Sequence, residues 1–443
     1  MKIQLSEHFS YQKLLRFVLP SVVMMIFTSI YGVVDGLFVS NFVGKTPFAA
    51  VNLIMPLLMI LGALGFMIGT GGSAIVAKTM GEGNLEKANQ YFSMLVYVTI
   101  AGGILLTILG QIGIRPVAMA MGATENMIDD CVLYGRILLV SLTAFMLQNV
   151  FQSFFVTAEK PQLGLGITVA AGLTNMVLDF LFIAVFHWGV AGAAVATALS
   201  QVVGGIVPIF YFMRSNNSRL RISSAKWDGR ALLKACTNGS SELMTNVSMS
   251  LVNMLYNFQL MRLVGENGVA AYGVIMYVNL IFVSIFLGYS IGSAPIVGYH
   301  YGAANHGELK SLSRKSLTLI GIAGIVLTLL AVGLSDSLSK IFVGYDEELF
   351  ALTKHGFRLY SLSFLVTGFN IFGSAFFTAL NNGAVSATIS FLRTLLFQII
   401  VVLILPIFLG INGIWLAIVV AELMALVVTV LFFITKRKQY HYA

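Results

Sequence analysis

Two aspartates lie inside apolar segments of this 443-residue chain. Asp179 interrupts the apolar run 172–183, and Asp35 has a similar setting in the first apolar segment. An ionised carboxylate at the centre of a bilayer costs about 2.5–3.5 kcal/mol on insertion scales, so such a residue usually has a function. Asn175 lies one helical turn before Asp179, on the same helix face. These oxygens suit Na⁺, and two close carboxylates can also share a proton.

The composition is that of a membrane protein. Hydrophobic residues make up 58% of the chain and charged residues 10%, with a mean hydropathy of +0.90. A soluble domain of this size carries about 25% charged residues. We therefore expect an all-α polytopic membrane protein, in which the lipid bilayer is the main partner.

Several function classes are disfavoured. The net charge of +8 comes from basic residues between the apolar runs, so it does not indicate nucleic acid binding. Cys131 and Cys236 have no metal or redox spacing, and no histidine motif for a metal is present. No nucleophile or metal set lies at membrane depth, so we do not expect an enzyme. No cofactor is expected besides a coupling ion, Na⁺ or H⁺.

Twelve apolar runs reach the roughly 20 residues that a helix needs to cross hydrocarbon. They lie at 17–40, 48–70, 92–113, 134–156, 163–186, 191–212, 239–261, 270–291, 317–334, 357–379, 386–408 and 413–434. If the N-terminus is inside, 18 Lys and Arg residues lie on the cytoplasmic side and seven on the other. This bias predicts a multi-pass protein of the cytoplasmic (inner) membrane with both termini in the cytoplasm.

The chain consists of two copies of an internal repeat. A shift of 221 residues places segment 149–158 on segment 370–379, and the same shift pairs glycines from the first helix to the last. We expect an N-terminal six-helix lobe, a cytoplasmic linker and a C-terminal six-helix lobe, at 1–212, 213–238 and 239–443. An even number of helices per copy gives both lobes the same orientation. Their pseudo-two-fold axis should therefore run along the membrane normal, with a cavity between the lobes.

Four polar residues break the repeat. Asp35, Asn175, Asp179 and Thr197 face Tyr256, Leu396, Ile400 and Ile418 under the 221-residue shift. Three helices supply these four groups, and Asp35, Asp179 and Thr197 are each expected roughly 8–11 Å below the outer surface at 1.5 Å per residue. The shared depth and the absence of these groups from the second copy predict one cation-binding site in the first lobe.

Three sequence features resemble the multidrug and toxic compound extrusion (MATE) antiporters. They are Pro20 fifteen residues before Asp35, the Gly-Glu-Gly-Asn loop at 81–84, and Asn175-x-x-x-Asp179. The resemblance covers nearly the whole chain, including its length and two-lobe plan. It implies twelve helices and an export function.

The resemblance also implies roles for individual residues. The four polar residues that break the repeat would form a Na⁺/H⁺ site, and bending of the first helix at Pro20 would be linked to drug release. Gln148 and Asn149 would line the cavity of the first lobe. Another branch of the family has acids in its seventh and tenth helices, and the tenth helix here, 357–379, has none.

Arg393 and Glu422 are the other charged residues at depth. They lie in the last two helices, where an Arg side chain can reach a neighbouring carboxylate or extend to the interface. We expect a structural ion pair. The alternative is a second ion site in the second lobe.

These observations predict a cation-coupled antiporter that exports small organic compounds, chiefly cationic amphipaths, and acts as a monomer. The alternative is a lipid-linked oligosaccharide flippase, which shares the two-lobe plan. Its anionic cargo should require several buried cations, and only Arg393 qualifies. A major-facilitator transporter would carry an Asp-Arg motif that segment 78–88 lacks. The sequence decides neither the substrate nor the coupling ion.

Overall fold

The structure is a computed structural model that describes residues 3–442, without the side chains of residues 40 and 45. Within this part the chain is helical, with no strand. The elements of the first half are α1 (Tyr11–Phe42), α2 (Lys45–Gly81), α3 (Leu85–Ala120), α4 (Ile128–Val140), α5 (Leu142–Thr157), α6 (Pro161–Asp179), the π-helix η1 (Phe180–Val185) and α7 (Gly189–Met213). Those of the second half are α8 (Gly229–Leu263), α9 (Glu266–Gly302), α10 (His306–Val343), α11 (Glu347–Ser361), α12 (Phe364–Ala379), α13 (Gly383–Phe391), the π-helix η2 (Leu392–Leu396), α14 (Phe397–Leu409) and α15 (Ile411–Tyr440).

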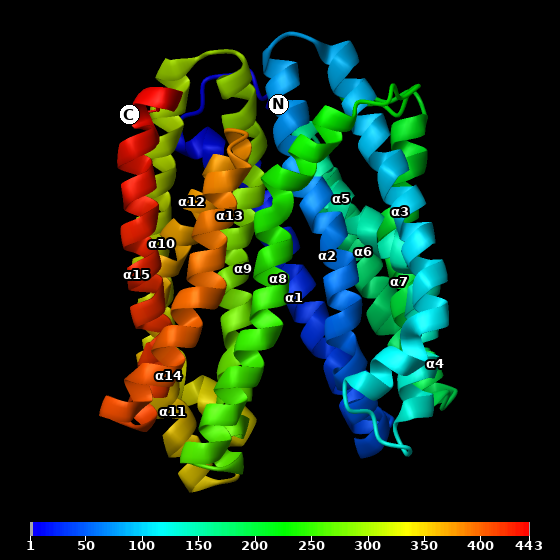
Figure 1. Ribbon diagram of the computed structural model, residues 1–443, viewed down its shortest axis with the longest axis vertical. Coiled ribbons are helices and arrows are strands. Elements are labelled where there is room, and N and C mark those ends of the chain that lie inside the picture. Colours follow the sequence, from blue (N-terminus) through cyan, green and yellow to red (C-terminus); the bar gives the residue numbers. More distant parts are fainter. Residues whose placement is uncertain (1–2, 443) are drawn as a thin grey trace.

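Each of the twelve predicted spans lies in one helix or in one interrupted helix. Within residues 3–442, nine helices are long and apolar enough to cross a membrane, and two bent pairs bring the number to eleven. The remaining span, 239–261, lies in α8, whose first half carries many hydroxyl and amide side chains. This helix packs against α2 and α13 and runs the full height of the molecule (Figure 1). The predicted all-α membrane fold is confirmed.

The two bent pairs occupy equivalent places in the repeat. The chain bends by 55° between α4 and α5 and by 49° between α11 and α12. The Ser141 hydroxyl lies 3.1 Å from the Leu138 carbonyl oxygen and 2.6 Å from Gln201 Oε1, and the Ser361 hydroxyl donates to the Phe357 carbonyl (2.6 Å). Serine hydroxyls that bond to backbone carbonyls compete with the helix ladder and favour a bend. The sequence predicted one helix at each place, 134–156 and 357–379, and the structure corrects this to two helices that meet at a bend.

The stretch between the halves is shorter than the predicted linker 213–238. α7 ends at Met213 and α8 begins at Gly229, so only 214–228 is non-helical. The Asp228 carboxylate caps α8 by accepting the Ala231 N–H (3.0 Å). Helices in this protein continue beyond the apolar runs, because hydropathy marks the part within lipid and not the end of the helix.

The two lobes are related by a pseudo-two-fold axis, as two glycine contacts show. A Cβ on Gly81 would lie 2.0 Å from the Tyr299 carbonyl oxygen, and one on Gly302 would lie 2.0 Å from that of Lys78. The two contacts exchange under the 221-residue shift. Only glycine permits this approach of α2 and α9, which joins the lobes near the chain termini (Figure 1).

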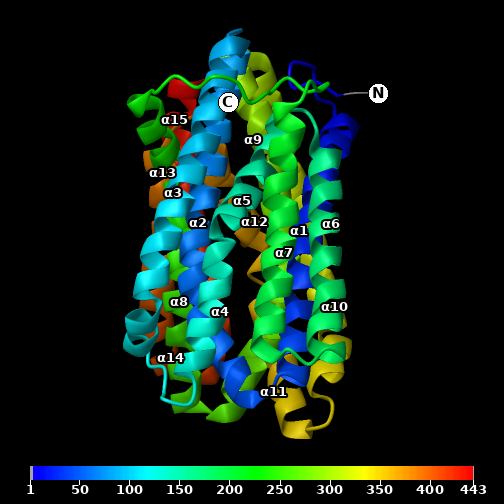
Figure 2. The same cartoon turned by 90° about the vertical axis from the view of Figure 1, so that its right-hand side faces the viewer.

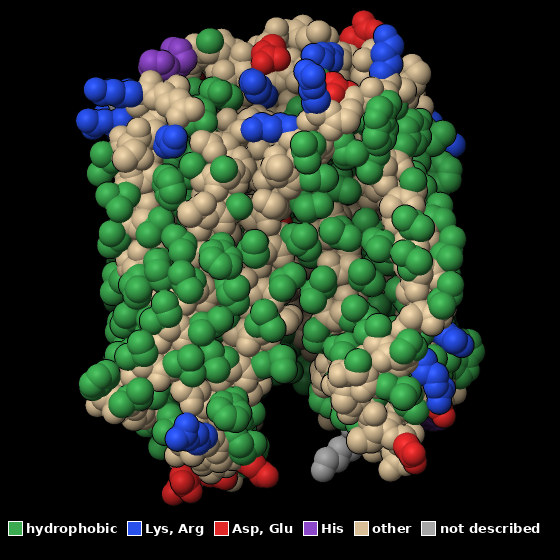
Figure 3. All heavy atoms as spheres, in the orientation of Figure 1, with side chains coloured by type: hydrophobic (Ala, Val, Ile, Leu, Met, Phe, Trp, Pro, Cys, Tyr) green, Lys and Arg blue, Asp and Glu red, His purple; other side chains and the backbone are tan. Residues whose placement is uncertain are grey.

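The lobes part at the end away from the termini, where the space-filling view shows a hollow between them (Figure 3). Lys and Arg side chains gather at the end with the termini, and apolar side chains cover the outer surface between the two ends (Figure 3). This distribution is the one expected for a protein that spans a bilayer.

Residues 3–10, here called the N-terminal strap, connect the two lobes at the closed end. Leu5 and Phe9 are fully buried. The Leu5 N–H donates to Glu159 of the first lobe, and the Phe9 N–H donates to Glu308 of the second, both at 2.9 Å. The His8 ring also contacts Glu308 (2.6 Å). The strap therefore ties α10 to the α5–α6 turn.

Candidate functional site

The four predicted polar residues come from three adjoining helices. α6 packs on both α1 and α7 (Figure 2). The Asp35 carboxyl of α1 lies near the side chains of Asp179, Asn175 and Thr197. The Asn175 amide donates to the Thr197 hydroxyl at 3.5 Å. The fold thus brings together residues that are as far apart in sequence as 35 and 197.

The cluster contains buried oxygens without partners. Asp179 is fully buried, Asn175 is 1% exposed, and Asp35 is partly buried. Four buried oxygens have no hydrogen-bond partner within the described residues: Asp35 Oδ1, Asp179 Oδ1 and Oδ2, and Asn175 Oδ1. Buried polar groups normally have a partner, and unpaired buried carboxylates are costly. A proton or a small monovalent cation among these oxygens would remove that cost.

A π-helix adjoins the buried aspartate. The α-helical pattern of α6 ends at Asp179, and the wider η1 turn begins at the next residue, with the Phe186 N–H bonded to the Leu181 carbonyl (2.8 Å). The sequence predicted an uninterrupted helix over 163–186. Single π-turns inside helices are rare and often lie at functional sites. In the second lobe, η2 contains Arg393, so each lobe has a π-turn beside a buried charge.

Two tyrosines that the sequence did not single out adjoin the cluster. The Tyr134 hydroxyl donates to Met55 Sδ (3.8 Å) and lies near Thr197, and this fully buried side chain faces both aspartates. Tyr31 interacts with Gln148 and faces Asp35. A Cβ on Gly172 would lie 2.8 Å from the Tyr31 ring, so glycine lets α6 approach α1 at this level. A tyrosine within an apolar segment looks like an ordinary packing residue, so the sequence gives no sign that these two lie beside the cluster.

Gln148 and Asn149 are both buried in α5. The Asn149 amide donates to the Gly62 carbonyl of α2 at 3.1 Å, which is a helix–helix contact. Gln148 contacts Tyr31 and therefore extends the polar cluster toward α5. Their assignment to the substrate cavity stays a prediction.

The charged residues of the second lobe form the expected ion pair. The Arg393 Nε donates to Glu422 Oε1 at 2.8 Å, and the side chains are 13% and 2% exposed. Asn370 donates to Glu422 Oε2 (2.7 Å), and Thr429 donates to Asn370 Oδ1 (2.9 Å). Every carboxylate oxygen of Glu422 therefore has a partner, in contrast to Asp179.

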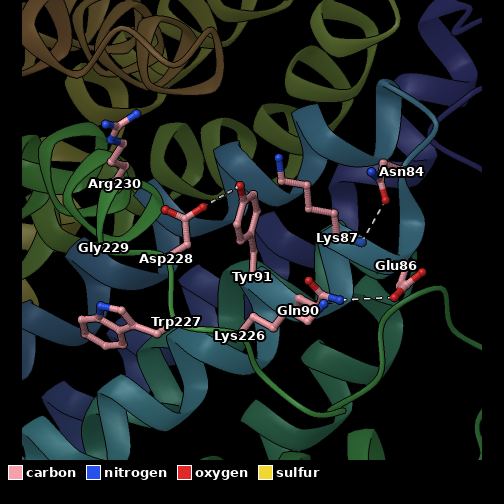
Figure 4. Close-up of a pocket in the computed structure, with 10 residues that line it drawn as sticks. All are labelled: Asn84, Glu86, Lys87, Gln90, Tyr91, Lys226, Trp227, Asp228, Gly229 and Arg230. Carbon is pink, nitrogen blue, oxygen red and sulfur yellow. Dashed lines mark hydrogen bonds between the residues drawn. The ribbon is translucent and has the colours of Figure 1, made fainter.

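A separate pocket of about 730 Å³ lies at the end with the termini, between the start of α3 and the start of α8 (Figure 4). None of the four predicted residues lines it. The Tyr91 hydroxyl donates to Asp228 (3.2 Å). The pKa of Asp228 is lowered, mainly because its carboxylate accepts the Ala231 N–H. Basic and acidic side chains alternate here, so the pocket has little net charge.

Comparison with known proteins agrees with this fold. The MatE family profile matches residues 20–181 and again 243–404. Multidrug export protein MepA of Staphylococcus aureus (strain MSSA476) is 22% identical over 414 residues, which cover 93% of this chain and 91% of MepA. A crystal structure of MATE in complex with MaL6 has a TM-score of 0.93 and 23% identity, with 98% of each chain covered.

An outward-facing multidrug resistance MATE family transporter of the MOP superfamily has a TM-score of 0.92 and 23% identity, again with 98% of each chain covered. The two profile matches correspond to the two lobes, at nearly the offset of the internal repeat. They cover most of the chain. This protein therefore belongs to the MatE family, whose members are membrane transporters and not enzymes.

Proposed function

We propose that this protein is a cation-coupled antiporter that exports small organic compounds, chiefly cationic amphipaths, in exchange for Na⁺ or H⁺. Asp35, Asn175, Asp179 and Thr197 would bind the coupling ion. One observation carries the proposal: these four groups, absent from the second repeat, converge and leave four buried oxygens without partners. MepA, a relative, is named a multidrug export protein, which supports organic compounds as substrates.

The geometry suggests how ion binding is linked to movement. Two carboxylates on different helices repel each other when both are charged, and a proton or Na⁺ between them draws the helices together. Asp35 lies on α1, which also carries Pro20. Proline removes one hydrogen bond of the helix ladder, so α1 is weakest against bending there. Ion binding at Asp35 would thus change the bend of α1 and the space left for the substrate.

The orientation is also part of the proposal. The Lys and Arg bias supports cytoplasmic termini. The hollow between the lobes then faces the outside, as expected for the state that releases an exported compound (Figure 3). We further propose that the lobes 1–212 and 239–443 move about the glycine contacts near the termini, and that one chain suffices for transport.

The flippase alternative is less well supported. A pyrophosphate cargo requires free cations at depth. Arg393 is committed to Glu422 and gives no net positive charge to the space between the lobes. The coupling site of the first lobe is acidic, which disfavours an anionic cargo.

The test is efflux from vesicles that hold the purified protein and a fluorescent cationic dye, under an imposed Na⁺ or pH gradient. We expect one of the gradients to drive efflux. Asp35→Asn and Asp179→Asn should each abolish it, while leaving the protein folded and inserted, because the carboxylates that bind the ion are lost. Asp129→Asn is the matched control, since Asp129 is 86% exposed and its pair with Arg115 is on the surface. Wild-type efflux by either variant would remove that aspartate from the coupling site.

A further inference from the structure

A second pocket, of about 950 Å³, opens at the end of the first lobe where the termini lie. Its walls come from α1, the α5–α6 turn, the end of α7 and the N-terminal strap, and it is here called the α1–α7 pocket. It contains none of the four coupling residues. Its lining places basic side chains beside an apolar wall, with polar side chains at the end of α7, and this combination requires an explanation.

Three cations line the α1–α7 pocket without an acidic partner. They are Arg16 in the second turn of α1, Lys160 at the start of α6 and Arg214 at the end of α7. None of them takes part in an ion pair within residues 3–442. The three helices adjoin, so the cations lie at one end of one bundle (Figure 2).

One carboxylate also lines the pocket, and it is largely neutralised. Glu159 Oε1 accepts the Leu5 N–H and faces Arg219 Nε at 3.3 Å, while its Oε2 is buried without a hydrogen bond. Arg219 offsets the charge of Glu159. The pocket therefore keeps the positive charge of its three unpaired cations, and a cationic transport substrate is an unsuitable occupant.

Part of the remaining lining is polar and consists of Gln162, Ser215, Asn216 and Asn217. The other part is apolar, continues onto the lipid-facing surface, and comprises Ile3, Phe17, Pro20, Pro161, Leu163, Val207, Phe210 and Tyr211. Val207 is 46% exposed and Phe210 is 59% exposed. The pocket thus places positive charge at the membrane boundary and an apolar wall toward the hydrocarbon. A free inorganic anion would use only the charged part.

We propose that the α1–α7 pocket binds an anionic phospholipid from the leaflet on the side of the termini. The phosphate and its neighbouring anionic groups bind Arg16, Lys160 and Arg214, and an acyl chain lies along Phe210 and Val207. Basic pockets between membrane helices are a recurring form of lipid headgroup site. Because Pro20 is in the apolar wall, the bound lipid contacts α1 at the residue where this helix is weakest.

The pocket of Figure 4 provides a matched control on the same side of the protein. Lys87, Lys226 and Arg230 line it, but so do Glu86 and Asp228. Two carboxylates among three cations leave little attraction for an anion. Neutralising Lys226 and Arg230 removes as much positive charge from this side as neutralising Arg16 and Arg214.

The experiment measures lipid binding by the full-length protein in zwitterionic phosphatidylcholine nanodiscs that contain increasing amounts of spin-labelled phosphatidylglycerol. We expect wild type to retain phosphatidylglycerol beside the protein. R16Q/R214Q should weaken this binding roughly thirtyfold, from the contribution of each basic side chain near a membrane surface. K226Q/R230Q should bind as wild type does.

Three results would overturn the proposal. One is wild-type binding by R16Q/R214Q, and another is an equal loss in both double variants, which would indicate attraction to the whole basic surface. The third is full displacement by millimolar inorganic phosphate or glycerol phosphate, which would make the occupant a free anion. If R16Q/R214Q does not fold, K160Q replaces it, with an expected loss of about fivefold. The readout is binding and not efflux, so failure here leaves the proposed coupling site untouched.

Discussion

The buried acids of the two lobes differ in whether their carboxylate oxygens have hydrogen-bond partners. In the second lobe, Arg393 and Asn370 satisfy both carboxylate oxygens of Glu422. In the first lobe, neither carboxylate oxygen of Asp179 has a partner within the described residues. A buried ion pair with complete hydrogen bonding needs no additional bound ion. Unpaired buried acids, in contrast, are tolerated where a cation binds and is released. This contrast favours coupling in the first lobe alone.

The ion pair should be structural. Glu422→Gln leaves Arg393 buried without a counter-charge, and we expect a loss of about 3–5 kcal/mol in the free energy of unfolding. Replacing Glu422 with Leu and Arg393 with Met together should recover most of that loss, since no unpaired charge remains. Thermal unfolding in detergent measures both effects, and efflux from vesicles should survive in the double variant. A stable double variant that binds dye but no longer couples to the gradient would show a second ion site.

Removal of the Thr197 hydroxyl should distinguish coupling to Na⁺ from coupling to H⁺. The hydroxyl oxygen can bind Na⁺, whereas a proton needs only a carboxylate. Thr197→Val keeps the volume and removes the oxygen, so Na⁺-driven efflux should require about tenfold more Na⁺, the worth of one good polar contact. Efflux driven by a pH gradient should be nearly unchanged. An equal loss under both gradients would mean that the hydroxyl orients the aspartates and does not bind the ion.

Among the helices, α1 carries both the coupling residue and a weak point. It is helical from Tyr11 to Phe42, through Pro20, although proline removes a backbone donor. It packs against α9 of the other lobe on both sides of Pro20, at Val18 and as far along as Ser29, and its last part contributes Asp35 to the cluster. A bend at Pro20 would therefore move Asp35 and also shift the contact of Ser29 with α9.

Pro20→Ala should slow transport more than it weakens substrate binding. Alanine restores the missing hydrogen bond and stiffens α1, so the bent state becomes rarer. We expect the turnover rate to fall several-fold, with dye affinity within about twofold of wild type. Pro56→Ala in α2 is a control, since it also removes a proline inside a helix. Equal losses of dye affinity and turnover rate would indicate that Pro20 serves only in packing and not in bending of α1.

At the level of the whole molecule, the closest backbone contacts between the lobes lie toward the end with the termini. The contact depends on close backbone approach at Gly81 and Gly302, and the N-terminal strap adds hydrogen bonds to both lobes. At the other end the hollow separates the lobes (Figure 3). A contact built on close backbone approach can separate and re-form, as alternating access requires.

Gly302→Leu should destabilise the closed end. Even a Cβ there would lie 2.0 Å from the Lys78 carbonyl oxygen, so α2 and α9 must move apart. Overpacking of this kind costs about 1–3 kcal/mol, which thermal unfolding in detergent would detect. Gly102→Leu is the control, because nothing lies within 4 Å of a Cβ at that position. Wild-type stability in Gly302→Leu would contradict the glycine contact.

The sequence alone determined the features that depend on local chemistry or on the repeat. Twelve spans follow from hydropathy, because crossing a bilayer demands a continuous apolar helix. The two-lobe plan and the MatE family follow from the repeat and from a few residues around Asp35 and Asp179. Comparing the two copies also selected the four polar residues that the fold brings together, since a group present in only one copy is not needed for the shared architecture.

Tertiary structure decided what depends on which helix faces meet. The partners of Glu422 and the tyrosines around the aspartates come from helices distant in sequence, so no local pattern indicates them. The π-turn after Asp179 and the bends at the serines replace the straight helices that hydropathy predicts, because it records polarity and not backbone bonding. The unpaired oxygens of Asp179 are likewise visible only in three dimensions. A hydrogen bond is absent only when every neighbouring helix has been placed.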